Sequence, residues 1–382
     1  MNAVASGKET YMNWKTKLRV SAAMLAGAAV ALPVAVRAET LVDQAKAVVT
    51  KATGRVDTWD GPTSGPKAVG KRLIVYVAGD MRNGGILGVA KGVKEAAGAI
   101  GWDYREIDGQ GTVSGQATAL SQAVALKPNA IIVGGSDAVE QKAALEDAAK
   151  QGITIVGWHS GPKPGPLDGT PVFANVTTDS MEVAKVAAMK AIADTDGKAG
   201  VVIFADSTYA IAIAKGHAME AVIKQCGGCS VLAFEDTPLA DVSTRIPQLT
   251  TGLVQHFGKK WTYSLAINDL YYDFMPPALE AAGIPGDGDP QNLSAGDGSE
   301  SAYQRIRAKE HQAGTVPEPL NMQGWQLVDE LNRAFAKQPW SGYIPGVHLV
   351  TADNVKYDGG PNNVFDPDNG YRDHYKAVWG VK

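Results

Sequence analysis

The sequence predicts an α/β protein made of two lobes, each built on a doubly wound parallel sheet. Two observations lead to this prediction. From residue 72 onward, short and nearly continuous apolar segments alternate with segments that have helical periodicity. Strands of that kind are typical of a parallel sheet covered by helices on both faces. The second observation is that one order of landmarks occurs twice along the chain.

The alternation is clearest in the first expected lobe. The expected strands are 72–78, 104–107, 130–133 and 154–158, and the expected helices are 86–99, 114–125 and 140–151. Each expected helix joins two expected strands. This βαβ arrangement makes successive strands parallel.

The repeated landmarks indicate that the second lobe has the same architecture. In the first lobe an apolar segment, 74–77, precedes Asp80 and the helical tripeptide AKG at 90–92; in the second, 201–204 precedes Asp206 and AKG at 214–216. Later in each half, a helix ends in Gly-Ile and a strand ends in a polar tip, His159-Ser160 or Asp297-Gly298. Four landmarks in the same order favour duplication over chance similarity.

The start of the chain has the form of a secretory signal peptide. Lys15, Lys17 and Arg19 precede an apolar run, 20–34, and small residues lie at the third-last and last positions before Glu39. These three features predict an exported protein, cleaved near Ala38. The alternative is a membrane anchor, but the run is shorter than the ~20 residues that span a bilayer.

Composition excludes several functions for the mature chain. Without residues 1–38, which carry five of the 36 basic and one of the 40 acidic residues, the balance is 31 against 39, a formal charge of −8. An acidic surface argues against nucleic acid, because its binding requires neutralised phosphates. The phosphate loop, the HExxH motif and the GxSxG elbow are missing, and the six histidines are scattered. We therefore expect no enzyme activity, no cofactor and no metal.

The two cysteines, Cys226 and Cys229, are separated by two glycines. In an exported protein this spacing favours a structural disulfide. The alternative is a redox pair, which requires a helix N-terminus to lower the thiol pKa. Here the pair follows a helical pattern and precedes a strand-like one, so the disulfide is expected to hold a helix-to-strand turn.

Both ends of the mature chain lie outside the repeat. Residues 39–70 begin with a helix-like segment and continue with Gly and Pro, which predicts an extension that lies on the first lobe. Residues 356–382 are rich in Gly, Pro, Asn and Asp and are expected to form an irregular tail.

Polar residues follow the ends of the predicted strands in both lobes. Ligands of open α/β sheets bind at this edge, where helix N-termini converge. The candidates taken from this position are Asp80, Asn83, His159, Asp206, Tyr209, Asn268 and Asp297, with Trp158 as an aromatic surface. Each of them, taken singly, is also a candidate helix cap.

Taken together, several segments resemble the type I periplasmic solute-binding proteins of the ribose and galactose class. The resemblance covers roughly 70–352 and rests on 74–84, 131–133 with 136–139, 153–159, 266–269 and 296–298. It implies two lobes, 71–177 with 319–343 and 178–318 with 344–355, joined by a three-crossing hinge near 175–178, 315–320 and 341–346. The family's sugar-binding positions fall on Asn83, His159, Lys215, Asp241, Asn268, Asp297 and Glu318. The chain departs from the ribose-type pattern at Gly85 and Ile86, where that pattern has aromatic residues.

The resemblance implies a substrate-binding component of an ABC importer that closes around a sugar or polyol. Its partners would be that ligand and an inner-membrane permease, and it would act as a monomer. The alternatives are a sensory protein that presents its ligand to a chemoreceptor or sensor kinase, and a binder of a non-sugar molecule. A further alternative is an exported enzyme with His159 and Asp297 as an acid/base pair.

Overall fold

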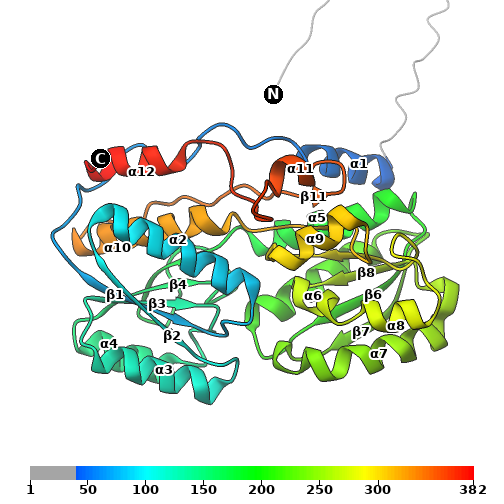
Figure 1. Ribbon diagram of the computed structural model, residues 1–382, viewed down its shortest axis with the longest axis horizontal. Helices are drawn as coiled ribbons and strands as arrows, with labels where there is room; N and C mark the ends of the chain where they lie inside the picture. The colour runs from blue at the N-terminus through cyan, green and yellow to red at the C-terminus, as the bar shows by residue number, and fades with distance from the viewer. Residues whose placement is uncertain (1–39) are drawn as a thin grey trace, which may run out of the picture. The chain divides into compact units, whose positions relative to one another are not determined.

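The computed structural model describes residues 40–382, so the predicted signal peptide lies outside the described residues. Two separate sheets form the centres of two lobes (Figure 1). The α/β prediction with two parallel sheets is confirmed. No helix among residues 40–382 is long and apolar enough to cross a membrane.

The first lobe contains a five-stranded, fully parallel sheet in the order β2-β1-β3-β4-β5. Its strands are β1 Leu73–Ala78, β2 Asp103–Asp108, β3 Ala130–Gly134, β4 Thr154–Trp158 and β5 Val172–Val176. The helices that pack in this lobe are α2 Gly84–Ile100, α3 Val113–Ala125, α4 Lys142–Lys150, α10 Leu320–Phe335 and α12 Tyr371–Trp379.

Side chains of β1 alternate between two hydrophobic clusters. Ile74 and Tyr76 pack with α2 and α10, whereas Val75 and Val77 pack with α3 and α4. Successive side chains of a strand point to opposite faces, so both faces of this sheet are buried. This explains why the strand reads as a continuous apolar run.

The second lobe contains a six-stranded sheet in the order β11-β10-β9-β8-β6-β7. Its strands are β6 Gly200–Ala205, β7 Ser230–Asp236, β8 Tyr263–Ala266, β9 Gln291–Ser294, β10 Gly314–Thr315 and β11 Val350–Thr351. Only the short pair β10–β11 is antiparallel. The helices are α1 Leu41–Ala52, α5 Ser180–Asp194, α6 Ala210–Lys224, α7 Val242–Phe257, α8 Pro276–Ala281, α9 Glu300–Ala308 and α11 Val355–Asp358, with short 3₁₀ segments η1 Leu239–Asp241, η2 Gly258–Lys260 and η3 Asp269–Asp273.

A disulfide joins Cys226 to Cys229, with the Cα atoms 5.2 Å apart. Cys226 follows the end of α6, and Cys229 precedes β7. The pair therefore closes the turn between helix and strand, as the sequence predicts.

The chain passes between the lobes three times within the repeated region. It crosses after β5, again between β10 and α10, and a third time between α10 and β11. These connections overlap the three segments 175–178, 315–320 and 341–346, where the resemblance places the hinge.

The terminal segments each add a further crossing, which corrects two expectations. Helix α1 packs on α5 of the second lobe, and the chain reaches the first lobe only near Trp59, so the extension does not lie on the first lobe alone. The C-terminal segment is not irregular throughout, because it forms α11 on the second lobe and α12 against α10 of the first (Figure 1). Phe365 and Asn369, which end the crossing, are buried in the second and first lobes respectively.

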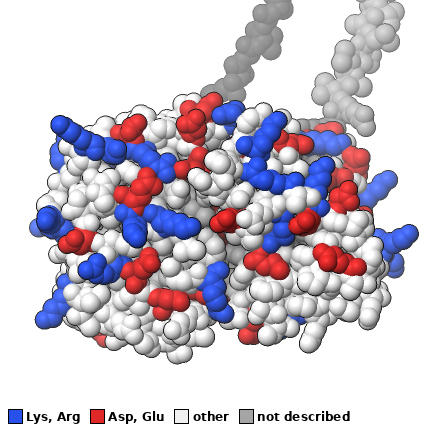
Figure 2. All heavy atoms as spheres, viewed as in Figure 1, with Lys and Arg blue, Asp and Glu red and all other residues white. Residues whose placement is uncertain are grey.

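Charges of both signs are mixed over the surface. Figure 2 shows Lys and Arg interspersed with Asp and Glu on the face it presents. Exposed pairs also occur on the surface, such as Lys142–Glu146 and Lys185–Glu182. Exposed pairs of this kind contribute little to stability, and this face carries no large field of one sign.

Candidate functional site between the lobes

A cavity opens where the carboxyl ends of the strands of both sheets meet. Residues of both lobes line it. The first lobe contributes residues that follow β1, β3 and β4, and the second lobe contributes the start of α6 and the segments after β8 and β9. This is the edge at which open α/β sheets place their ligands.

Most of the predicted site residues lie together at this cavity. Eight of the eleven line it: Asp80, Asn83, Trp158, His159, Tyr209, Lys215, Asn268 and Asp297. The other three, Asp206, Asp241 and Glu318, do not.

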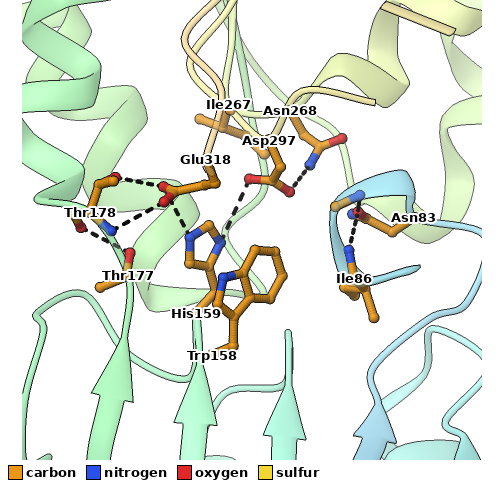
Figure 3. A network of polar contacts seen from close by, with 12 residues as sticks. Asn83, Ile86, Trp158, His159, Thr177, Thr178, Ile267, Asn268, Asp297 and Glu318 are labelled. Atoms are coloured by element: carbon orange, nitrogen blue, oxygen red, sulfur yellow. Dashed lines mark hydrogen bonds and ion pairs between the residues drawn. The ribbon is translucent and has the colours of Figure 1, made fainter. Parts of the chain in front are cut away.

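His159 lies at the centre of the polar network that Figure 3 shows. It directly follows β4, and its backbone has φ 50°, in the left-handed region. The imidazole stacks on the indole of Trp158, with centroids 3.9 Å apart and planes 7° apart. Its Nδ1 lies 3.6 Å from Asp297 Oδ1, and its Nε2 lies 3.2 Å from Glu318 Oε1. A first-lobe side chain thus contacts a carboxylate of the second lobe and one of the second crossing.

Glu318 contacts Nε2 of His159 and accepts hydrogen bonds from other residues. Its carboxylate accepts hydrogen bonds from the Thr178 backbone N–H (3.2 Å), the Thr178 hydroxyl (2.6 Å) and the Gln323 side-chain amide. These three hydrogen bonds occupy most of the approximately four acceptor positions of a carboxylate, and His159 Nε2 lies 3.2 Å from Oε1. Burial alone would raise the pKa of Glu318, but His159 and the hydrogen bonds from Thr178 and Gln323 outweigh it and lower the pKa to about 2. Glu318 therefore already has protein partners, and it does not line the cavity.

Asn268 and Asp297 form the second-lobe side of the network. The Asn268 amide Nδ2 donates to Asp297 Oδ2 at 2.7 Å, and Asn268 Oδ1 accepts from the Leu270 backbone N–H at 3.0 Å. This second bond caps η3 and fixes which way the amide points. Asp297 is 5% exposed, so its carboxylate is presented to the cavity in one orientation.

The close approach of Asp297 to the first lobe depends on Gly85. A Cβ atom at Gly85 would lie 2.5 to 2.8 Å from side-chain atoms of Asp297, and one at Gly84 would lie 2.7 Å from Ser299. Real Cβ contacts essentially never come that close. A side chain at position 85 would therefore require Asp297 to shift.

Asn83, at the start of α2, is both a cap and a cavity residue. Its Oδ1 accepts from the backbone N–H groups of Gly85 (2.9 Å) and Ile86 (3.3 Å), which is an N-cap. Asn83 lines the cavity, and its Nδ2 makes no hydrogen bond to another described residue.

Lys215, Asp80 and Tyr209 each have a protein partner as well. Lys215 Nζ, buried on α6, donates to the carbonyls of Ile267 (3.0 Å) and Ala295 (2.6 Å). Both oxygens of Asp80 accept from the Arg82 guanidinium. Tyr209 is raised in pKa chiefly by burial, and its hydroxyl accepts from the side chain of Gln116 in the other lobe.

Asp206 and Asp241 lie outside the cavity for different reasons. Asp206 is fully buried and accepts from the Thr208 backbone N–H, the Thr208 hydroxyl and the Leu239 backbone N–H, so it holds the loops after β6 and β7. Asp241 is exposed, and the two residues before it, Leu239 and Ala240, line the cavity instead.

Sequence reasoning missed the aliphatic part of the lining. The apolar residues that line the cavity are Ile86, Ile211, Ala212, Leu239, Ala240, Ile267 and Leu270. None of them was predicted as a site residue; Ile86 was noted only as a departure from the ribose-type pattern. Their signal is weak, because an apolar residue near a strand end or at the start of a helix reads as core. Their position directly after strands was the one available indication.

The lobes are in contact beside the cavity. The Ala210 backbone N–H donates to Asp137 Oδ2 of the first lobe at 3.2 Å. Together with the His159–Asp297 contact, this bond defines a closed arrangement of the two lobes. Within residues 40–382 no group of three His, Cys, Asp or Glu residues is placed to hold a metal ion.

Solved structures share this fold at low sequence identity. One is a galactofuranose-binding protein (17% identity, 79% of this chain and 99% of the other, TM-score 0.64). Another is a solute-binding protein from Agrobacterium vitis bound with alpha-D-tagatopyranose (16%, 77% and 99%, TM-score 0.67). A third, from Bacillus halodurans C-125, carries myo-inositol (18%, 77% and 97%, TM-score 0.63).

A comparison with curated proteins found no match. The family profile described as "Periplasmic binding protein domain" matches residues 74–339, more than half of the chain. The matched region contains both sheets except β1's first residue and β11, together with every polar residue of the network around His159. The chain therefore belongs to the periplasmic binding protein family.

Proposed function

We propose that this protein is the solute-binding component of an ABC importer and captures a small neutral sugar or polyol between its lobes. One observation carries the proposal: polar side chains from both lobes converge on one interlobe cavity. Sugar hydroxyls both donate and accept, and the cavity offers them a carboxylate, two amides and an ammonium group. The structurally similar proteins bound with tagatopyranose and myo-inositol support the same ligand class.

A neutral ligand agrees with the charges at the cavity. Asp80 pairs with Arg82, Asp297 lies next to His159, and the Lys215 ammonium group lies at the same cavity. Neither a free cluster of cations nor a free cluster of acids is left for a strongly charged ligand. An affinity in the micromolar range, roughly −8 kcal/mol, requires only a few charge-assisted hydrogen bonds of about 1.5 to 3 kcal/mol each.

The proposed mechanism is closure about the hinge. The rigid bodies would be the lobes expected from the sequence, 71–177 with 319–343 and 178–318 with 344–355. A ligand that contacts Asn83 and His159 on one lobe and Asn268 and Asp297 on the other binds the closed form better than the open one. It stabilises closure by that difference in affinity. The closed monomer would then be recognised by an inner-membrane permease in the periplasm, after cleavage of the signal peptide near Ala38.

A thermal-shift panel tests this function directly. Residues 39–382 are purified and heated with pentoses, hexoses, polyols and small organic acids, and each hit is measured by calorimetry. We expect a carbohydrate or polyol to raise the melting temperature and to be recovered chemically unchanged after long incubation. A shift by acids alone would contradict the ligand class, and a converted ligand would indicate an enzyme.

Asp297→Ala should abolish the ligand-induced shift. Loss of a buried charge-assisted hydrogen bond lowers affinity by about 1.5 to 3 kcal/mol, which is roughly 10- to 100-fold. Asp241→Ala is the matched control, because Asp241 is an exposed aspartate of the same lobe outside the cavity. Equal loss in both variants would mean that the cavity is not the binding site.

A further inference from the structure

The polar groups of the cavity are unevenly available to a ligand. Lys215 uses two of its three N–H groups on backbone carbonyls, and the Trp158 indole N–H donates to Gln323 at 2.7 Å. Both oxygens of Asp80 are held by Arg82. Capacity remains chiefly on Asn83 Nδ2 and on Asp297, whose Oδ1 lies 3.6 Å from His159. Asn268, Asp297 and His159, which lie next to one another (Figure 3), form the polar side of the cavity.

The remaining wall is aliphatic apart from Tyr209, whose hydroxyl accepts from Gln116. Ile211 and Ala212, at the start of α6, are 7% and 4% exposed and line the cavity with Leu239 and Ala240 of η1. The backbone N–H of Leu239 donates to the buried Asp206 at 2.8 Å, which holds η1 in place. We call these four residues the aliphatic wall.

The aliphatic wall is set by the elements of the second lobe and is not a loose surface. Ile211 and Lys215 are four residues apart on α6 and therefore lie on the same face of the helix. Because Lys215 is tied to the carbonyls of Ile267 and Ala295, the start of α6 is fixed relative to β8 and β9. A hydroxyl that meets Ile211 or Leu239 would find a side chain with no donor or acceptor.

We infer that the ligand is a partly deoxygenated sugar or polyol. Its hydroxyl-bearing part contacts Asn83, Asn268 and Asp297, and a methyl or methylene group packs on the aliphatic wall. This inference rests on the function proposed above and narrows its ligand class. A buried hydroxyl without a partner loses its hydrogen bonds to water, whereas a methyl group at that place gains from leaving water.

Matched pairs of ligands that differ by one hydroxyl test the inference. The pairs are L-fucose with L-galactose, L-rhamnose with L-mannose, 6-deoxy-D-glucose with D-glucose, and 1,2-propanediol with glycerol, each titrated by calorimetry. An apolar pocket rejects an added hydroxyl by about 100-fold at most. We expect the deoxygenated member of the pair that binds to have a Kd at least 10-fold lower.

Variants test whether the preference for the deoxygenated ligand comes from the aliphatic wall. Leu239→Ser is expected to reduce the preference to below threefold, because it supplies a hydroxyl partner where the methyl group packs. Leu249→Ser is the matched control, since Leu249 is a partly buried leucine of the same lobe outside the cavity. Leu239→Ala removes apolar contact without adding a polar group. It should weaken the binding of both ligands of a pair, and the deoxygenated ligand should still bind more tightly.

The outcomes separate this inference from the proposed function. Equal or tighter binding of the fully hydroxylated member overturns the inference and leaves the sugar-binding function standing. A preference that persists in Leu239→Ser also overturns it, provided that the variant melts as cooperatively as the parent protein. If no sugar or polyol binds at all, the proposed function is wrong and the inference is wrong with it.

Discussion

Gly85 and Asp297 come from different lobes, and the closed arrangement depends on the space between them. Gly85→Ala places a Cβ within 2.5 to 2.8 Å of the Asp297 side chain. We expect about 10-fold weaker ligand binding, close to 1.4 kcal/mol, because the closed form must shift to accept the methyl group. The melting temperature without ligand should change little, since the clash exists only when the lobes meet.

Gly98→Ala on the same helix is the control for this prediction. A Cβ at Gly98 meets no atom within 4 Å. Alanine in a helix interior is more favourable than glycine by about 0.5 to 1 kcal/mol, so this variant should be slightly more stable and bind normally. Unchanged binding by Gly85→Ala would show that Asp297 does not approach α2 in the ligand-bound protein.

The polar half of the site was predictable from sequence because polar residues after apolar strands are conspicuous. Asn83, Asn268 and Asp297 were found in this way and line one cavity. Glu318 was not distinguishable from a ligand contact, because its partners Thr178 and Gln323 come from other segments of the chain. Only the folded structure brings these donors to its carboxylate.

At the scale of elements, α10 carries a buried acid whose proton is linked to stability. Burial is the main cause that raises the pKa of Glu330 from its ordinary 4.5 to about 7; the negative charge of Asp329 adds to it, and hydrogen bonds from Ser341 oppose it. Between these two values the folded protein holds a proton that the unfolded chain has lost. The free energy of unfolding should therefore fall as the pH rises from about 4.5 to 7.

Glu330→Gln should make the stability less dependent on pH in that window. Urea unfolding at pH 5 and pH 7.5 measures the difference, and the variant should lose less stability than the parent protein on going to the higher pH. The slope is reduced and not abolished, because Asp269, whose pKa burial raises to about 6, acts with the same sign. Glu310→Gln, at an exposed position, is the control. An unchanged slope in Glu330→Gln would contradict the prediction.

Four of the five strands of the first lobe were predictable as elements, whereas β5 and the last helix were not. Strands β3 and β4 are continuous apolar runs, and their observed bounds agree with the expected ones within one residue. Helix α12 was hidden by the Gly, Pro and Asn residues before it. Its buried side chains, Tyr371, Tyr375, Val378 and Trp379, follow the i, i+4, i+7, i+8 spacing of an amphipathic helix. That spacing was the available signal.

At the scale of the whole molecule, the terminal segments tie the two lobes together beside the hinge. The Leu349 backbone N–H donates to the Ala52 carbonyl at the second-lobe end of the third crossing. At its first-lobe end, Asp60 accepts from the Tyr343 hydroxyl at 2.7 Å. The segment 52–60 therefore runs beside the third crossing, and bending of the hinge has to move both.

Trp59 is the anchor of this segment on the first lobe. Its ring stacks on His374 and contacts the edges of Tyr343 and Tyr375, with centroids 5.3 to 5.4 Å apart. Trp59→Ala should lower the free energy of unfolding by about 2 to 3 kcal/mol, less than the 3 to 5 kcal/mol usual for a fully buried Trp, because the ring is half-buried.

Release of this anchor should also let the ligand-free lobes open further. A segment that keeps the two lobes near each other raises the populated fraction of the binding-competent form. The apparent affinity for the ligand scales with that fraction. We therefore expect Trp59→Ala to have a larger radius of gyration than the parent protein in small-angle X-ray scattering, with the difference removed by saturating ligand. Thr58→Ala is the matched control, because Thr58 is exposed and bonds only to Asp57. A ligand-free radius that is the same in both variants would show that the terminal segments stabilise the first lobe without restraining the hinge.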